Sequence, residues 1–297
     1  QHPERLNELR DIVRHLPPSI ERFDVSGTDL YKSDDKEVIK LFANLPSSVT
    51  SLGVKLHRLK LISAVVSSLH PSLKELSLDG CPIGSTKNNS VQAFNALCAA
   101  LQPSVKKLSL RSTQLSALSI LHSIPLFTKL HQGLEELDIS DNGLGQMSKE
   151  ALSKLFASMP AGLRILGCAS NVSTPSSHTT YTKFFQALHS APAALSEFNF
   201  SGNGLTQCKE FSFSSTTLPA TVTSLSLFEP GMRDAHCASL LTNMPAHINT
   251  LSFKGQSALL RSKIGLLQSF FTYVPKTVTT LDCSNTGLHQ WSEEQLS

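Results

Sequence analysis

One sequence motif recurs along nearly the whole chain of 297 residues. In most copies it consists of a proline, an aliphatic residue a few positions later, and two apolar residues that flank a single residue. The first residue of each apolar pair falls at positions 23, 52, 76, 108, 137, 166, 198, 225, 251 and 281, with an average spacing of about 29 residues. Such a period predicts a stack of repeats, because each unit buries its apolar face only against its neighbours.

Each repeat combines two apolar periods. The apolar pair has the period of two that marks a short strand, and the segment between pairs has helical spacing, as in Val38, Leu41, Phe42 and Leu45. A strand and a helix in every repeat give a parallel sheet, whose strands lie about 4.8 Å apart while helices need about 10 Å. We therefore predict an α/β solenoid of about ten repeats, a curved arc with strands on the concave face and helices on the convex face.

The repeat resembles that of leucine-rich repeat proteins of the ribonuclease-inhibitor-like class. The resemblance is clearest in Leu134-x-x-Leu137-x-Ile139-x-x-Asn142-x-Leu144. It implies that one side chain in each turn satisfies backbone groups inside that turn. The residues that match this turn position are Asn142, Asn171, Asn203 and Cys81. The pattern is broken, and we expect less regular turns, at Thr28, His57, Thr113, Pro230, Gln256 and Thr286.

A looser resemblance concerns the particular residues that make up the repeats. The phrase Leu45-Pro46-x-x-Val49-x-x-Leu52, with serine-rich turns, is similar to leucine-rich repeat effectors of intracellular bacterial pathogens, of the Legionella kind. This resemblance implies a protein that is injected into a host cell and binds a host component in the host cytosol.

The repeats also decide the domain organisation. The length alone suggests about two domains, but the continuous period predicts one leucine-rich repeat domain over residues 1–297. Residues 1–16 have apolar side chains at helical spacing and are expected to form a capping helix. The ten repeats then occupy residues 17–288, and residues 289–297 form either a C-terminal cap or a truncated continuation.

The charge and the cysteine content exclude several classes of protein. The net charge is only +3, from 26 basic and 23 acidic residues, so a nucleic-acid partner is not expected. No stretch approaches the ~20 apolar residues of a membrane span, and no secretory signal is visible. Six cysteines are too few for a disulfide scaffold. We expect a monomer in a reduced, cytoplasmic compartment.

The sequence contains no motif that carries chemistry. Zinc-ligand spacings, phosphate-binding glycine loops and the nucleophile-elbow motif are all missing, so we expect no metal, no cofactor and no catalytic activity. Cys98, Cys168 and Cys283 replace core residues and are expected to be buried. Cys208 and Cys237 fall outside the core phrase and are the more reactive candidates.

The residues that alternate with the buried pair point into the concave face. The middle position of this face carries only small side chains, which leaves a groove for a partner's side chains. Glu75, Lys107 and Glu136 are neighbours on adjacent strands, and Asp79 and Arg111 repeat the pattern. These charges have two interpretations: a self-neutralising ladder that supports the sheet, or a patch that fixes the register of a polar partner.

The sequence therefore predicts a protein-interaction module that binds a protein partner through its concave face. Ile165 and Phe228 are apolar residues that point outward without a reason in the fold, which makes them anchor candidates. The full set of candidate binding residues is Phe228, Ile165, Arg111, Lys107, Asp138 and Lys254. The alternative function is the substrate-recognition domain of a larger enzyme, such as a ubiquitin ligase, whose catalytic part lies outside this chain.

Overall fold

Every repeat contributes one three-residue strand to a single parallel sheet. The strands follow chain order, and each is centred on the first residue of an apolar pair. They are β1 (Arg22–Asp24), β2 (Ser51–Gly53), β3 (Glu75–Ser77), β4 (Lys107–Ser109), β5 (Glu136–Asp138), β6 (Ile165–Gly167), β7 (Glu197–Asn199), β8 (Ser224–Ser226), β9 (Thr250–Ser252) and β10 (Thr280–Asp282). The predicted α/β solenoid is confirmed.

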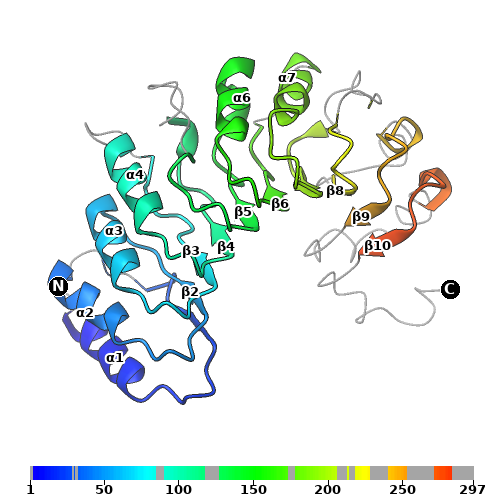
Figure 1. The fold of residues 1–297 in the computed structure, drawn as a ribbon. Coiled ribbons are helices and arrows are strands. Elements are labelled where there is room, and N and C mark those ends of the chain that lie inside the picture. The colour runs from blue at the N-terminus through cyan, green and yellow to red at the C-terminus, as the bar shows by residue number, and fades with distance from the viewer. Residues whose placement is uncertain are drawn as a thin grey trace.

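The computed structural model describes residues 3–28, 30, 33–84, 90–117, 127–172, 178–205, 213, 218–227, 240–252 and 271–282. Figure 1 shows an arc in which the strands line the inner side and the helices lie on the outer side. The cap predicted over residues 289–297 lies outside the described residues.

The helices pack side by side on the convex face. Contacts join α1 to α2, α2 to α3, α3 to α4 and α6 to α7. Their bounds, with one 3₁₀ turn, are α1 (Pro3–Arg14), α2 (Asp35–Ala43), α3 (Leu59–Ser68), α4 (Ser90–Ala100), η1 (Leu144–Gln146), α6 (Lys149–Ala157) and α7 (His178–Leu188). None of the helices in the described part of the chain is long and apolar enough to cross a membrane.

Side-chain caps fix where two of these helices begin. The Asp34 carboxylate accepts hydrogen bonds from the backbone N–H groups of Lys36 and Glu37 at the start of α2. The Ser148 hydroxyl accepts one from the backbone N–H of Ala151 in α6. Each cap satisfies donors that a helix leaves without an internal partner at its N-terminus.

Helix α1 packs against α2 at the start of the repeats and buries most of its apolar stripe. Leu6, Leu9 and Val13 are buried against the core. Ile12 lies on the same apolar pattern in the sequence, but its side chain is 50% exposed. A stripe at helical spacing is wider than the surface that α2 offers, so the edge of the stripe remains in solvent.

Aromatic side chains fill the core between the sixth and seventh repeats. Phe200 is completely buried, and its ring centroid lies 4.9 Å from those of both Phe184 and Phe185 on α7. Phe198 stacks on it at 5.6 Å, and Tyr181 meets it edge-on at 6.5 Å. The contacts combine tilted, edge-on and stacked geometries of the kind that aromatic rings favour.

Buried asparagines connect the turns of consecutive repeats. The Asn142 side-chain oxygen accepts hydrogen bonds from the backbone N–H groups of Thr113 and Leu115 in the preceding repeat, both at 3.0 Å. Its amide nitrogen donates to three backbone carbonyls, at 2.8 to 3.1 Å. Asn171 accepts from the N–H of Asn142, and Asn203 accepts from that of Asn171. We call these residues the asparagine ladder.

Two other side chains take ladder positions without being asparagine. The Cys81 sulfur accepts a hydrogen bond from the Leu56 N–H at 3.2 Å, across one repeat. Thr113 is buried and donates from its hydroxyl to the Leu110 carbonyl, which is the bond that Asn142 and Asn203 make to their own turns. The expectation of a less regular turn at Thr113 is therefore wrong, because a hydroxyl can replace the amide donor.

Candidate functional site

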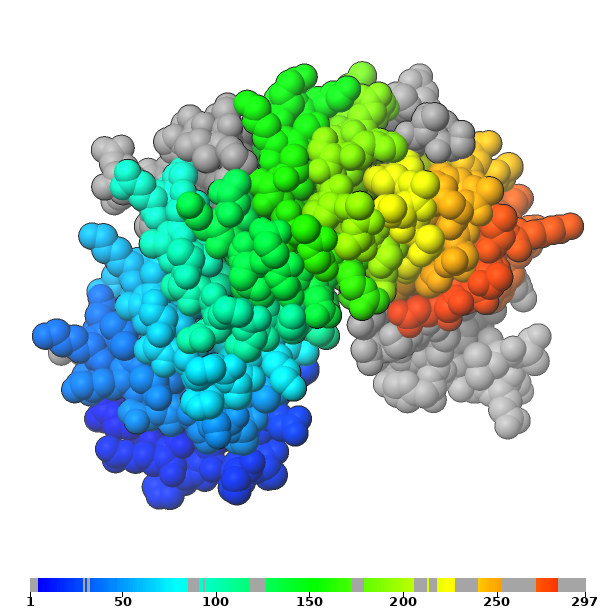
Figure 2. Space-filling view, in the orientation of Figure 1, coloured from blue at the N-terminus to red at the C-terminus, as the bar shows by residue number. Residues whose placement is uncertain are grey.

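The concave face of the sheet consists of the two outward side chains of each strand. Two open hollows run along it, one over β1 to β5 and one over β4 to β10. Figure 2 shows the molecule as an arc that is open on its inner side. The middle positions of this face carry Ser77, Ser109 and Ser226 and the glycines of β2 and β6. The floor of the face is consequently low, while longer side chains stand at the first position of several strands.

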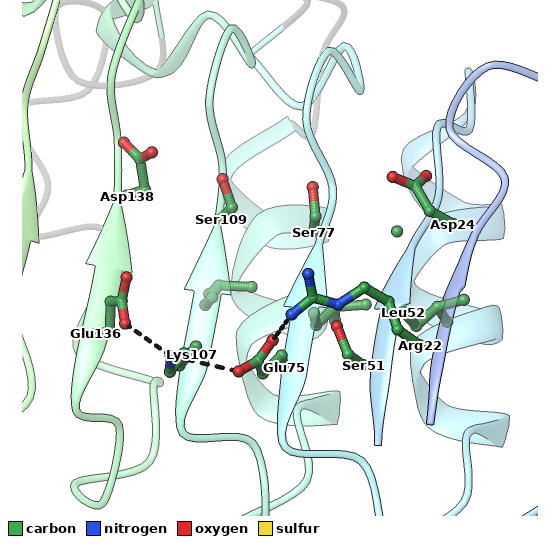
Figure 3. Close-up of a pocket in the computed structure, with 13 residues that line it drawn as sticks. Arg22, Asp24, Ser51, Leu52, Glu75, Ser77, Lys107, Ser109, Glu136 and Asp138 are labelled. Carbon is green, nitrogen blue, oxygen red and sulfur yellow. Dashed lines mark hydrogen bonds and ion pairs between the residues drawn. The ribbon is translucent and has the colours of Figure 1, made fainter. Parts of the chain in front are cut away.

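A ladder of ion pairs runs from the first to the fifth repeat at those first positions (Figure 3). Arg22 contacts Glu75 at 3.3 Å, and Lys107 contacts Glu75 at 3.3 Å and Glu136 at 3.4 Å. Burial raises the pKa of Glu75, but the hydrogen bond and charge of Lys107, with Ser51 and Arg22, outweigh it and lower that pKa. The charge of Glu136 raises the pKa of Lys107, and Glu75 adds to this effect.

This charged ladder neutralises itself. It joins two cationic and two anionic side chains, which are between 33% and 75% exposed. Exposed pairs of this kind contribute only about 0–1 kcal/mol each to stability. The geometry therefore agrees with the first interpretation of these charges, and Lys107 has both its acidic neighbours as partners.

Two aspartates of the middle row are held against glycines of the next strand. Asp138 Oδ1 accepts a hydrogen bond from the Ser140 N–H at 2.8 Å, and a Cβ on Gly167 would lie 2.6 Å from that oxygen. Asp24 repeats the arrangement with Ser26 and Gly53. The backbone hydrogen bond from Ser26 is the main reason why the pKa of Asp24 is lowered. Asp138, a predicted binding residue, thus has a local structural partner for one of its oxygens.

The expected ion pair between Asp79 and Arg111 does not form. Asp79 Oδ1 instead accepts hydrogen bonds from the Ser109 hydroxyl at 2.5 Å and from the backbone N–H of Arg111 at 3.0 Å. The aspartate side chain is short, and these nearer donors satisfy its oxygen. The Arg111 side chain is exposed and makes no ion pair with a residue in the described structure.

Three predicted binding residues come together in the second hollow. Lys107, Asp138 and Ile165 all line it, on three adjacent strands. Ile165 is partly exposed and points outward, as predicted. Glu197 is not among the predicted binding residues, but it lies next to Ile165 on β7 and lines the same hollow. The alternation of buried and outward residues already places Glu197 on the concave face, so the sequence could have indicated it. Phe228 and Lys254 lie outside the described residues.

The described residues show no cluster for metal chemistry. Within the ranges given above, no group of three or more histidine, cysteine or acidic side chains could hold a metal ion. The three described cysteines, Cys81, Cys98 and Cys168, are free thiols in the core. Burial raises the pKa of Cys81 to about 11 and also raises the pKa values of Cys98 and Cys168.

These shifts predict that the three thiols are inert in the folded protein. A thiol reacts as the thiolate, and burial both suppresses that form and blocks access. At pH 8, iodoacetamide should leave Cys81, Cys98 and Cys168 unmodified in the native protein and should modify all three in denaturant, as read by peptide mass spectrometry. Rapid native labelling of Cys168, which is completely buried, would contradict the described packing. Cys208 and Cys237 lie outside the described residues, and their greater reactivity stays a prediction.

The repeated strand–turn–helix unit and its asparagine turns define a leucine-rich repeat protein. A family model described as Leucine Rich Repeat matches residues 133–155, the repeat that contains β5 and Asn142. The fold is similar to that of the leucine-rich repeat-containing protein LegL7 from Legionella pneumophila, with a TM-score of 0.70 and 20% sequence identity. The alignment covers 92% of this chain and 86% of the LegL7 chain. No curated protein matches the chain in sequence.

Proposed function

We propose that the chain is a non-catalytic interaction module whose repeats act as one unit and bind a protein partner on the concave face. The observation that carries this proposal is the low floor of that face, whose middle row is small from β2 to β9 and which is hollowed over both halves. A partner's side chains can reach the sheet there, and Ile165 offers them a partly exposed apolar contact.

The setting of this binding is a second part of the proposal. The serine-rich turns of the repeats and the similarity to a Legionella leucine-rich repeat structure support a role as a bacterial effector that acts on a host protein in the host cytosol. The candidate binding residues are Ile165, Lys107, Asp138 and Arg111 in the described structure, together with Phe228 and Lys254.

A bulky side chain on the floor of the groove tests this function. Ser226 lines the second hollow and is partly exposed, so Ser226→Trp should fill the groove. We expect host proteins that the unmodified chain captures from a lysate to be lost with this variant, as measured by quantitative mass spectrometry. The melting temperature should change by no more than about 1–2 °C, because substitutions at solvent-accessible positions rarely exceed 0.5 kcal/mol.

The matched control places the same substitution on the convex face. Ser67 is exposed on α3, and its hydroxyl bonds only to the Ser63 carbonyl one helical turn earlier. Ser67→Trp should therefore leave capture intact. Equal capture by the Ser226→Trp protein would refute binding through the concave face, and loss of capture with Ser67→Trp alone would move the binding surface to the helices.

A further inference from the structure

The concave face changes its charge character along the arc. Over β1 to β4 the two outward positions of each strand include two basic side chains, Arg22 and Lys107, and two acidic ones, Asp24 and Glu75. From β5 to β10, the two outward positions of each strand include no lysine or arginine. The charged residues at these described positions are Glu136, Asp138, Glu197 and Asp282. The chain as a whole has a net charge of +3, so this half of the face has the opposite sign to the protein that carries it.

Glu197 is an acidic side chain of this half that has no compensating partner among the described residues. Within the described structure, no hydrogen bond or ion pair is made by its carboxylate. Arg164, whose backbone carbonyl accepts a hydrogen bond from the Glu197 N–H, has an exposed side chain that makes no hydrogen bond or ion pair with a described acidic residue. Glu136, in contrast, already shares Lys107 with Glu75.

Ile165 lies directly between two of these carboxylates. The strand register places it opposite Glu136 on one side and Glu197 on the other. Neighbouring strands are about 4.8 Å apart, so the two acidic positions lie on the order of 10 Å from each other across the apolar one. All three line the same open hollow. This surface, which we call the acidic subsite, therefore consists of an apolar side chain with a carboxylate on each side of it in the same row.

A lysine or arginine side chain has the matching chemistry. Its methylene stem covers apolar surface while its charged head remains at the polar edge, and a guanidinium or ammonium forms charge-assisted hydrogen bonds with carboxylates. We infer that the partner presents a lysine or arginine to the acidic subsite, with the stem on Ile165 and the head at Glu197. The inference rests on the proposed binding through the concave face. The same charges oppose the phosphates of a nucleic acid.

A peptide library tests the inference without knowledge of the partner. Random peptides displayed on phage are selected on the unmodified protein, and the winners are synthesised with a fluorescent label for anisotropy measurements. We expect enrichment of peptides in which lysine or arginine is required for binding. Glu197→Lys should lower the affinity for these peptides on the order of tenfold or more. Replacing the required basic residue of the peptide by glutamate should restore its binding to this variant. Binding should also weaken between about 0.05 and 0.5 M NaCl.

The control reverses a charge on the N-terminal helix, outside the concave face. Glu8 is exposed on α1 and makes no hydrogen bond or ion pair with a described residue, so Glu8→Lys should not change the affinity. Ile165→Ser should lower the affinity for the basic peptides even though Glu197 is still present, because the methylene stem of the peptide's lysine or arginine loses its apolar contact.

The outcomes separate the two proposals. Peptides that lose binding with Ser226→Trp but bind the Glu197→Lys protein equally well would overturn the inference and leave concave-face binding standing. Enrichment of acidic peptides, or of peptides whose sequence matches a segment of this chain, would overturn the inference in the same way. Peptides that bind the Ser226→Trp protein as tightly as the unmodified protein would count against both the proposed function and the inference. A selection that yields no binder would do the same.

Discussion

Replacing Phe200 by alanine should lower the free energy of unfolding by about 3–5 kcal/mol, the range for a buried phenylalanine. Its ring is completely buried and contacts the rings of Phe184, Phe185, Phe198 and Tyr181. Truncation therefore removes contacts with several aromatic neighbours at once and leaves a cavity between two repeats. Urea denaturation followed by circular dichroism gives the loss directly.

The same substitution at an exposed ring is the control. Phe271 is 59% exposed, so Phe271→Ala should change the free energy of unfolding by less than about 0.5 kcal/mol. Equal effects of the two substitutions, or a loss below about 1 kcal/mol for Phe200→Ala, would contradict the packing of the aromatic cluster.

Replacing Asn142 by alanine should destabilise the protein by about 3 kcal/mol or more. The substitution leaves the backbone N–H groups of Thr113 and Leu115 without their acceptor, and each buried group that loses its partner costs about 1–3 kcal/mol. The three carbonyls that the amide donates to lose a partner as well. Hydrogen exchange adds a local measurement, because the amides of Thr113 and Leu115 should lose protection before those of distant repeats.

Asn199 provides the matched comparison on the concave face. Its side chain is partly exposed and accepts a hydrogen bond from the Ser201 N–H at 3.0 Å. Asn199→Ala should therefore cost only about 1 kcal/mol. The ladder account fails if Asn142→Ala costs no more than Asn199→Ala, or if the protection of Thr113 is unchanged.

The fold could be predicted from the sequence because one period carries most of its information. Each strand centre, such as Leu52 or Leu137, was fixed by the recurring apolar pair, and the sides of the strands followed from alternation. The repeat pattern does not predict the regular turn at Thr113, because the pattern is defined by residue type, whereas a threonine hydroxyl can donate the same hydrogen bond. The helix stripe likewise gave no measure of how much surface α2 offers to Ile12.

The candidate site was predictable in its position and less so in its contacts. Alternation places Arg22, Ser51 and Glu75 on one row, but it does not state how far a side chain reaches. Arg22 contacts Glu75 two strands away because the intervening Ser51 is short. Adjacent opposite charges predict an ion pair between Asp79 and Arg111, but the competing backbone and hydroxyl donors become visible only in three dimensions.

The asparagine ladder also has a consequence for binding kinetics. It links the turns from Thr113 through Asn142 and Asn171 to Asn203, and β6 and β7, which carry Ile165 and Glu197, lie within that span. A surface held by buried cross-repeat hydrogen bonds is already organised before its partner arrives, so association loses less conformational entropy. Loosening the ladder should therefore shorten the lifetime of a complex even where no contacting residue is altered.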